Sequence, residues 1–140
     1  MRSRPEPGAK RSGERGQALV EFAFTSIVFF VTIFGVFEFG RAIWQYNVVS
    51  NLATEGVRRA SVCGNYSALA SGDCNIQSFV SGRSLGFTVV ATTTPSTLST
   101  LQPGDVVTVQ VQSTFVPAVG ALLPSKTMTL QSTAKMITAR

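Results

Sequence analysis

The chain has 140 residues, 44% of them hydrophobic, and a formal net charge of +5. This length allows one modest domain and an anchor, but not two full domains. The absence of histidine excludes His-based catalytic triads and most metal centres, and no glycine-rich phosphate-binding loop occurs. We therefore expect no enzymatic activity, no metal, no cofactor and no small-molecule substrate.

The N-terminal segment is basic and precedes an apolar run. Residues 1–16 carry five lysines or arginines and two glutamates, whereas residues 22–37 carry no charge. Because Lys and Arg accumulate on the cytoplasmic side of a span, the N-terminus is expected in the cytoplasm and the C-terminal domain outside. Basic residues gathered beside an apolar run indicate membrane topology rather than nucleic-acid binding.

The expected span covers residues 17–41 of a single-pass protein of the inner (cytoplasmic) membrane. About 20 apolar residues suffice to cross the hydrocarbon core as a helix. A conventional secretory signal fits less well, because its apolar region has only about 7–15 residues and ends in a small-residue cleavage site. One carboxylate, Glu21, stands at the head of the apolar run, within the expected span. Since a charge there costs about 2.5–3.5 kcal/mol on insertion scales, it points to a function.

The helix is expected to continue outside the membrane over residues 42–61. This stretch has no proline, and its apolar side chains recur at three- and four-residue spacing. Gln45 and Glu55 are expected on a wetter face, with Glu55 placed to pair with Arg58 and Arg59. The apolar stripe is expected to pack on the chain's own globular part, a partner helix being the alternative. It comprises Tyr46, Val49, Leu52, Ala53, Gly56, Val57 and Ala60.

Aromatic and charged residues mark the outer boundary of the span. Phe39, Trp44 and Tyr46 flank it, and amphipathic rings favour the headgroup level. Glu38 and Arg41 are three residues apart and could pair there. Independent snorkelling of both groups to the interface is the alternative.

The two cysteines, Cys63 and Cys74, lie on the expected outer side, eleven residues apart. In an oxidising compartment this indicates one structural disulfide, which would stabilise the domain by roughly 3 kcal/mol in the chain-entropy model. Two thiols without histidine cannot complete a four-ligand zinc site in one chain, and the spacing is not the C-x-x-C of redox proteins.

The remainder, within residues 62–140, is expected to be rich in β-structure. A short helix over residues 76–82 precedes a strand beginning at Phe87, and residues 107–115 and 128–136 alternate apolar and polar side chains. Three short strands do not fold alone, so they need a covering helix. The sequence therefore predicts an α+β fold, in which a long N-terminal helix crosses the membrane, extends beyond it and packs on a small antiparallel β-sheet.

Three segments of the chain form a recognisable pattern: Gly16-Gln-Ala-Leu-Val-Glu-Phe-Ala23, Glu38-Phe-Gly-Arg41 and Ala53-Thr-Glu-Gly-Val-Arg58-Arg-Ala60. Together they resemble the TadE-like family of the tight-adherence (Tad/Flp) type IV-like pilus system. The strands after residue 103 are similar more loosely, and Val57 departs from the alanine expected there. The positions taken to match the family motifs are Glu38, Gly40, Arg41, Gly56 and Arg58.

The resemblance implies a minor pilin or pseudopilin that serves assembly of an adhesive pilus. A prepilin peptidase would cut between Gly16 and Gln17, removing residues 1–16 as a leader. The implied partners are this peptidase, other pilin-like subunits, pilus assembly membrane proteins and the lipid bilayer. Incorporation into the pilus is compatible with this view.

A physical role for Glu21 follows from such processing. The new α-amino group of Gln17 would lie at the positive end of the helix dipole, where a carboxylate one turn later can neutralise it. We expect Glu21 to pair with the amine of an adjacent subunit, an intrachain cap of the helix start being the alternative.

In a second hypothesis, from a different class of function, residues 1–16 are not removed. The chain would then be an unprocessed, single-pass membrane-anchored protein with an extracytoplasmic binding domain. A third possibility is an adhesin at the pilus tip, whose contacts would include an exposed Ser/Thr-rich loop at residues 92–100.

Overall fold

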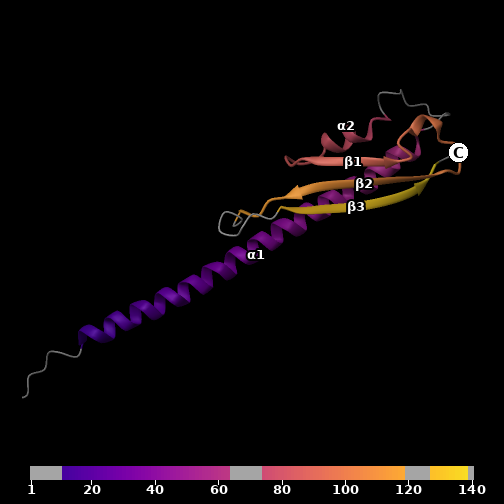
Figure 1. Ribbon diagram of the computed structural model, residues 1–140. Coiled ribbons are helices and arrows are strands. Elements are labelled where there is room, and N and C mark those ends of the chain that lie inside the picture. Colours follow the sequence, from indigo (N-terminus) through magenta and orange to yellow (C-terminus); the bar gives the residue numbers. More distant parts are fainter. Residues whose placement is uncertain (1–10, 64–73, 119–126, 139–140) are drawn as a thin grey trace, which may run out of the picture. The chain divides into compact units, whose positions relative to one another are not determined.

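The computed structural model describes residues 11–63, 74–118 and 127–138 (Figure 1). The chain divides into two compact units, Met1–Phe37 (unit 1) and Glu38–Arg140 (unit 2). Helix α1 (Arg11–Ser61) contributes to both units, and the other described elements belong to unit 2. These are α2 (Ile76–Ser81), β1 (Val89–Thr94), a short 3-10 helix η2 (Leu98–Thr100), β2 (Val106–Phe115) and β3 (Met128–Ile137).

In unit 1, α1 exposes its apolar side chains. Every side chain from Gly16 to Phe37 is exposed apart from one half-buried serine. Thr25 Oγ1 donates to the carbonyl oxygen of Glu21 (2.9 Å), and Thr32 Oγ1 donates to that of Val28 (2.8 Å). These two hydroxyls are satisfied within the helix, as an apolar solvent requires. Among the described residues, α1 is the one helix long and apolar enough to cross a membrane.

Helix α1 begins at Arg11 rather than at Gln17, the start of the expected span. The junction between Gly16 and Gln17 therefore lies inside the helix of the full chain. Glycine in a helix interior costs about 1 kcal/mol relative to alanine, which is too little to end a long helix.

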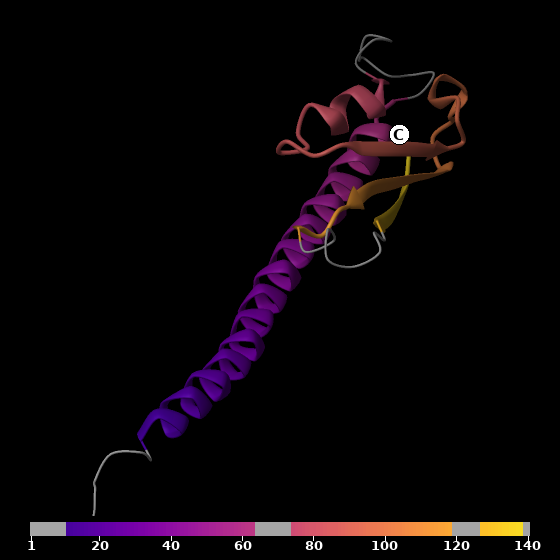
Figure 2. The ribbon, with the colours of Figure 1, turned by 60° about the vertical axis from the view of Figure 1, so that its left-hand side comes forward.

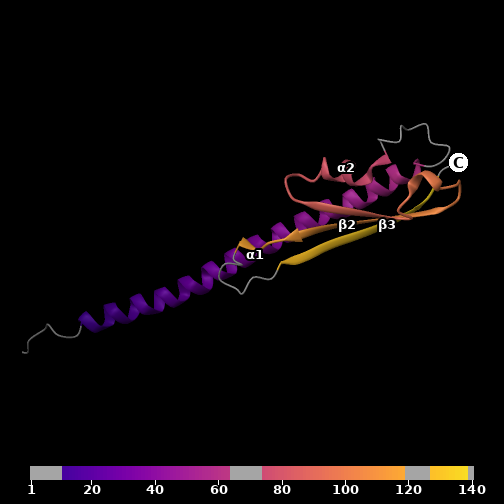
Figure 3. The same cartoon turned by 45° about the horizontal axis from the view of Figure 1, so that its top comes forward.

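The sheet of unit 2 is antiparallel, in the order β1-β2-β3 (Figures 1 and 2). Val109, in the middle of β2, pairs with Thr93 of β1 and Ala134 of β3. Alternate residues of β2 are buried, as its period of two predicts, so one face of the sheet is turned inward. The part of α1 that belongs to unit 2 covers this face (Figure 3), and the α+β prediction is confirmed.

The core of unit 2 forms where α1, α2 and the sheet meet. Apolar residues recur along α1 at helical spacing, and they meet the inward valines of β2 and two residues of α2. The residues at the centre of this core are Val49, Leu52, Ala53, Val57, Ala60, Ile76, Val80, Val107, Val109 and Val111.

One position of the predicted stripe is wrong. Tyr46 is exposed, whereas its neighbour Gln45 is buried with 7% of its surface accessible. Gln45 Nε2 donates to Ser113 Oγ (2.7 Å), and Ser113 Oγ donates to the carbonyl oxygen of Thr88 (2.9 Å). A buried amide with its partner in place costs little, so the helix can direct Gln45 to the sheet. Periodicity alone could not reveal a partner 68 residues away.

Glu55 has a partner outside α1, which its spacing from Arg58 and Arg59 did not predict. Glu55 Oε2 lies 3.4 Å from Nη1 of Arg83, which follows α2. The Arg83 guanidinium lies 4.1 Å from the ring centroid of Phe79, and that of Arg59 lies 4.7 Å from the same ring. Phe79 thus engages both arginines, and Glu55 reaches the turn that follows α2.

The Ser/Thr-rich segment at residues 92–100 is only partly an exposed loop. Its first residues belong to β1, and Leu98 of η2 is buried together with Leu101 (8% and 4% accessible). These leucines add to the core, a contribution that the Ser/Thr content of the segment concealed.

The outer edge of β1 is occupied by one side chain of α2. Gln77 Nε2 donates to the carbonyl oxygen of Val89 (3.0 Å), and the backbone N–H of Ala91 donates to Gln77 Oε1 (2.6 Å). The amide thereby makes the two bonds that a neighbouring strand would make at these residues.

Candidate functional site

The candidate processing junction lies on the exposed part of α1 in unit 1. A side chain placed at Gly16 would meet nothing within 4 Å. Glu21 is exposed, and its carboxylate has no ion-pair partner among the residues that the structure describes. Gly16, Gln17 and Glu21 are therefore accessible to another molecule. Packing within this unit gives no reason for a glycine or a carboxylate at these positions.

A second candidate group, Glu38 and Arg41, stands at the start of unit 2. The ion pair expected from their spacing is present, with Arg41 Nη2 3.7 Å from Glu38 Oε2. Glu38 Oε1 also accepts a hydrogen bond from the backbone N–H of Ala118 (3.0 Å). The Glu38 side chain is 13% accessible, so these are contacts of a largely buried carboxylate rather than of a snorkelling one.

Arg41 completes the contact with the end of β2. Its Nη2 donates to the carbonyl oxygen of Val116, and its guanidinium lies 4.8 Å from the ring centroid of Phe115. A planar guanidinium can stack on a ring and donate at its edge, which a lysine cannot do. Glu38 and Arg41 together hold residues 115–118 to the first turn of α1 in unit 2.

Gly56 lies where α1, α2 and β2 meet. A Cβ atom at this position would lie 3.2 Å from Val109 Cγ1 and 3.5 Å from both Ile76 Cγ2 and Val80 Cγ2. The glycine therefore allows three elements to approach one another closely. Gly40 differs, because a Cβ atom there would meet nothing within 4 Å.

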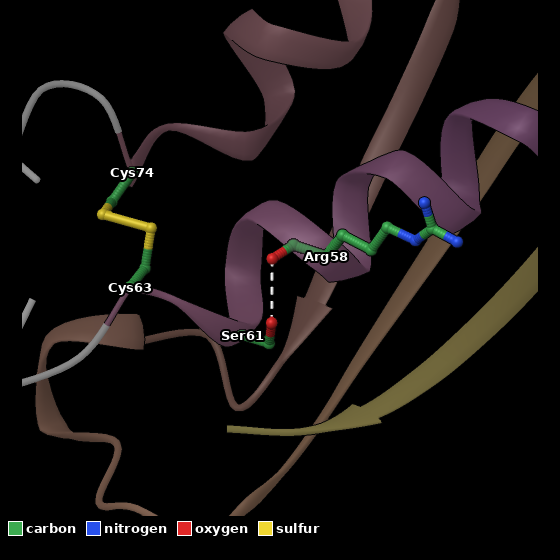
Figure 4. The surroundings of a disulfide bond; sticks show 4 residues. All are labelled: Arg58, Ser61, Cys63 and Cys74. Atoms are coloured by element: carbon green, nitrogen blue, oxygen red, sulfur yellow. Dashed lines mark hydrogen bonds between the residues drawn. A yellow bond between two sulfur atoms is a disulfide. The ribbon is translucent and has the colours of Figure 1, made fainter. Parts of the chain in front are cut away.

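The last turn of α1 leads into the disulfide. Cys63 and Cys74 are bonded, with their Cα atoms 5.8 Å apart, and the predicted disulfide is present. Arg58 accepts a hydrogen bond at its carbonyl oxygen from Ser61 Oγ (2.8 Å). Its exposed guanidinium points away from the disulfide (Figure 4). A cation in the last turn is stabilised by the negative end of the helix dipole.

The residues from the junction to Arg58 are similar to one protein family. A family model described as TadE-like protein matches residues 16–58. This segment is similar to TadE-like proteins. The match begins at Gly16 of the junction and ends at Arg58 near the end of α1, so it covers most of this helix and none of the strands. No curated protein and no solved structure matches the chain significantly.

The positions within the TadE-like match form two groups, which differ in whether they contact other elements of the described chain. Gly16 and Glu21 contact no other element of the described chain, whereas Glu38, Arg41 and Gly56 contact the sheet or the segment after β2. Sequence reasoning missed the partners of this second group, because Val116 and Ala118 lie 75 and 80 residues further along the chain.

Proposed function

We propose that the chain is a minor pilin or pseudopilin of a Tad/Flp-type pilus, cut after Gly16 by a prepilin peptidase. One observation carries the proposal: the TadE-like segment begins with an exposed glycine, followed five residues later by an exposed lone carboxylate at the head of the uncharged run 22–37. Neither residue stabilises the described chain through packing, so their use lies in contacts with other molecules.

The membrane position proposed for the protein follows from charge and hydropathy. The basic residues of 1–16 stay in the cytoplasm, α1 of unit 1 spans the inner membrane, and unit 2 lies outside. The bonded cysteines agree with an oxidising compartment for unit 2.

Glu21 is the residue proposed to act in assembly. Cutting after Gly16 would free the α-amino group of Gln17, which adds a positive charge to the positive end of the helix dipole. In lipid this charge needs a counter-charge, and Glu21 of an adjacent pilin-like subunit would supply it. Pilus assembly membrane proteins are the further partners of this role.

The alternative function is an unprocessed, single-pass membrane protein with an extracytoplasmic binding domain. One observation favours it: α1 runs through the junction, and a protease needs an unwound substrate. Two helix-weakening glycines, Gly13 and Gly16, lie at this place in the sequence, so local unwinding there costs less than elsewhere.

Intact mass and N-terminal sequencing, with and without the prepilin peptidase, separate the two functions. Under the proposal the protein starts at Gln17 only when the peptidase is present. Gly16→Val should block this step almost completely, because a β-branched side chain prevents close approach to the backbone. Gly35→Val, in the same helix, is the matched control and should be processed normally. A full-length protein in both strains would refute processing.

Glu21→Gln tests assembly separately from processing. The variant should be cut nearly as well as the natural chain, because the cut bond is four residues away from the change. Pilus assembly should be strongly reduced, since the amine of the neighbour would lose its counter-charge. Counting surface pili measures the effect, with Thr25→Val as a control in the same exposed part of the helix. Normal piliation of the Glu21 variant would contradict the pairing.

A further inference from the structure

Large apolar side chains are exposed at one end of the sheet in unit 2. Val89 pairs with Ser113 and Phe115 pairs with Met128, so β1 and β3 begin at the end where β2 finishes. Around this end Leu85 is 69% accessible, Val116 59% and Met128 58%.

This end of the sheet contacts the first turns of α1 in unit 2. Glu38 and Arg41 bind the backbone of residues 116–118, and Trp44 stacks edge-on against Phe87, with ring centroids 6.0 Å apart. These turns add exposed apolar surface of their own, namely Phe39, Ile43 and Trp44.

Chain connectivity keeps this end close to the proposed span. Glu38 directly follows Phe37, the last residue of the uncharged run. At 1.5 Å per residue Trp44 lies about 10 Å along the helix from Phe37. The headgroup layer on each side of a bilayer is roughly 5–8 Å thick. By chain continuity alone, the residues that Glu38 and Arg41 hold are within reach of the headgroup level.

Charge and composition at this end favour lipid as the occupant. The carboxylate of Glu38 and the guanidinium of Arg41 pair with each other and bind the backbone, which lowers the cost of burying their surroundings. The connection that leaves β2 has no charged residue from Val116 to Pro124 in the sequence. Scattered apolar residues are normal on a surface, but a group of them beside a span marks an interaction site.

We propose that this end of unit 2 rests in the outer membrane–water interface, so that the folded unit has a lipid contact in addition to its helical anchor. The inference rests on the membrane insertion in the proposed function, but not on processing or on a pilus. Aromatic and aliphatic side chains at headgroup depth are the groups that such a contact uses. The lipid-seating surface comprises Phe39, Ile43, Trp44, Leu85, Val116 and Met128.

The single tryptophan of the chain allows a direct test. In a Trp44→Phe background, one tryptophan is introduced into the full chain at Leu85 or Val116 and the protein is reconstituted in phosphatidylcholine–phosphatidylglycerol vesicles. Brominated acyl chains then quench any tryptophan that reaches the interface. Phe34→Trp reports insertion of the span, and Ile137→Trp, at the other end of the sheet, is the matched control. All four replaced side chains are at least half exposed, so a larger ring fits.

Three results decide the inference. The expected one is a blue shift and a loss of emission for tryptophan at positions 85 and 116, with no change at position 137. Quenching at position 34 without quenching at 85 and 116 would overturn the lipid contact and leave the anchor intact. If Leu85→Glu and Val116→Glu nevertheless abolished assembly, the surface would face a protein. No quenching at position 34 would remove membrane insertion, and the inference with it.

Discussion

The two halves of α1 share a regular backbone but use their apolar residues in opposite ways. In unit 1 apolar side chains occur all round the helix and are exposed, so this half is stable only in an apolar solvent. In unit 2 they form one stripe that packs on the sheet, and Val49, Ala53 and Ala60 have no accessible surface. One helix is thus built for two different surroundings, and the ion pair of Glu38 and Arg41 stands where they change.

The sharpest way to test this difference is to place a carboxylate in each half. Val57→Asp buries a charge against the sheet and should destabilise unit 2 by about 3–5 kcal/mol. Val31→Asp should leave the unfolding of unit 2 unchanged, but should weaken membrane insertion by about 2.5–3.5 kcal/mol. Urea unfolding in detergent, followed by Trp44 fluorescence, measures the first effect, and membrane fractionation measures the second.

Thr54→Asp is the control for the first variant, because Thr54 is exposed on the same half of α1. It should change the stability of unit 2 only slightly. Equal effects of Val57→Asp and Thr54→Asp on unfolding would mean that α1 does not pack on the sheet.

A smaller effect distinguishes the glycines of the two halves. Gly56→Leu would force a side chain against Val109, Ile76 and Val80, and should destabilise unit 2 by about 1–3 kcal/mol. Gly56→Ala should be nearly neutral, because the gain of about 1 kcal/mol in helix propensity offsets the close approach. Gly35→Leu should leave the unfolding of unit 2 unaltered. Thermal unfolding of the three variants in the same detergent would expose any departure from this order.

The smallest effect concerns the neighbours Gln45 and Tyr46. Gln45→Ala removes the hydrogen bond to buried Ser113 and should cost about 1 kcal/mol, whereas Tyr46→Ala should change stability by less than about 0.5 kcal/mol. A larger loss of stability for Tyr46→Ala than for Gln45→Ala in urea unfolding would mean that Tyr46, and not Gln45, is buried against the sheet.

Patterns that depend on nearby residues were predictable from sequence. The long apolar helix, most of the stripe on α1, the short helix α2, the alternation in β2 and the disulfide all follow from local spacing or composition. Partners distant in sequence did not follow, because Glu55 could meet either an arginine one turn away or Arg83 of another element. The roles of Gly56 and Arg41 likewise became clear only when β2 was placed beside α1.

The amide of Gln77 has a consequence for how these molecules can associate. Stacking sheets head to tail, with β3 of one molecule beside β1 of the next, would need both edges and could continue without limit. Gln77 already occupies the backbone groups of Val89 and Ala91, so a neighbour could add at β1 only by displacing α2. The chain thereby carries its own block against open-ended polymerisation through its sheet.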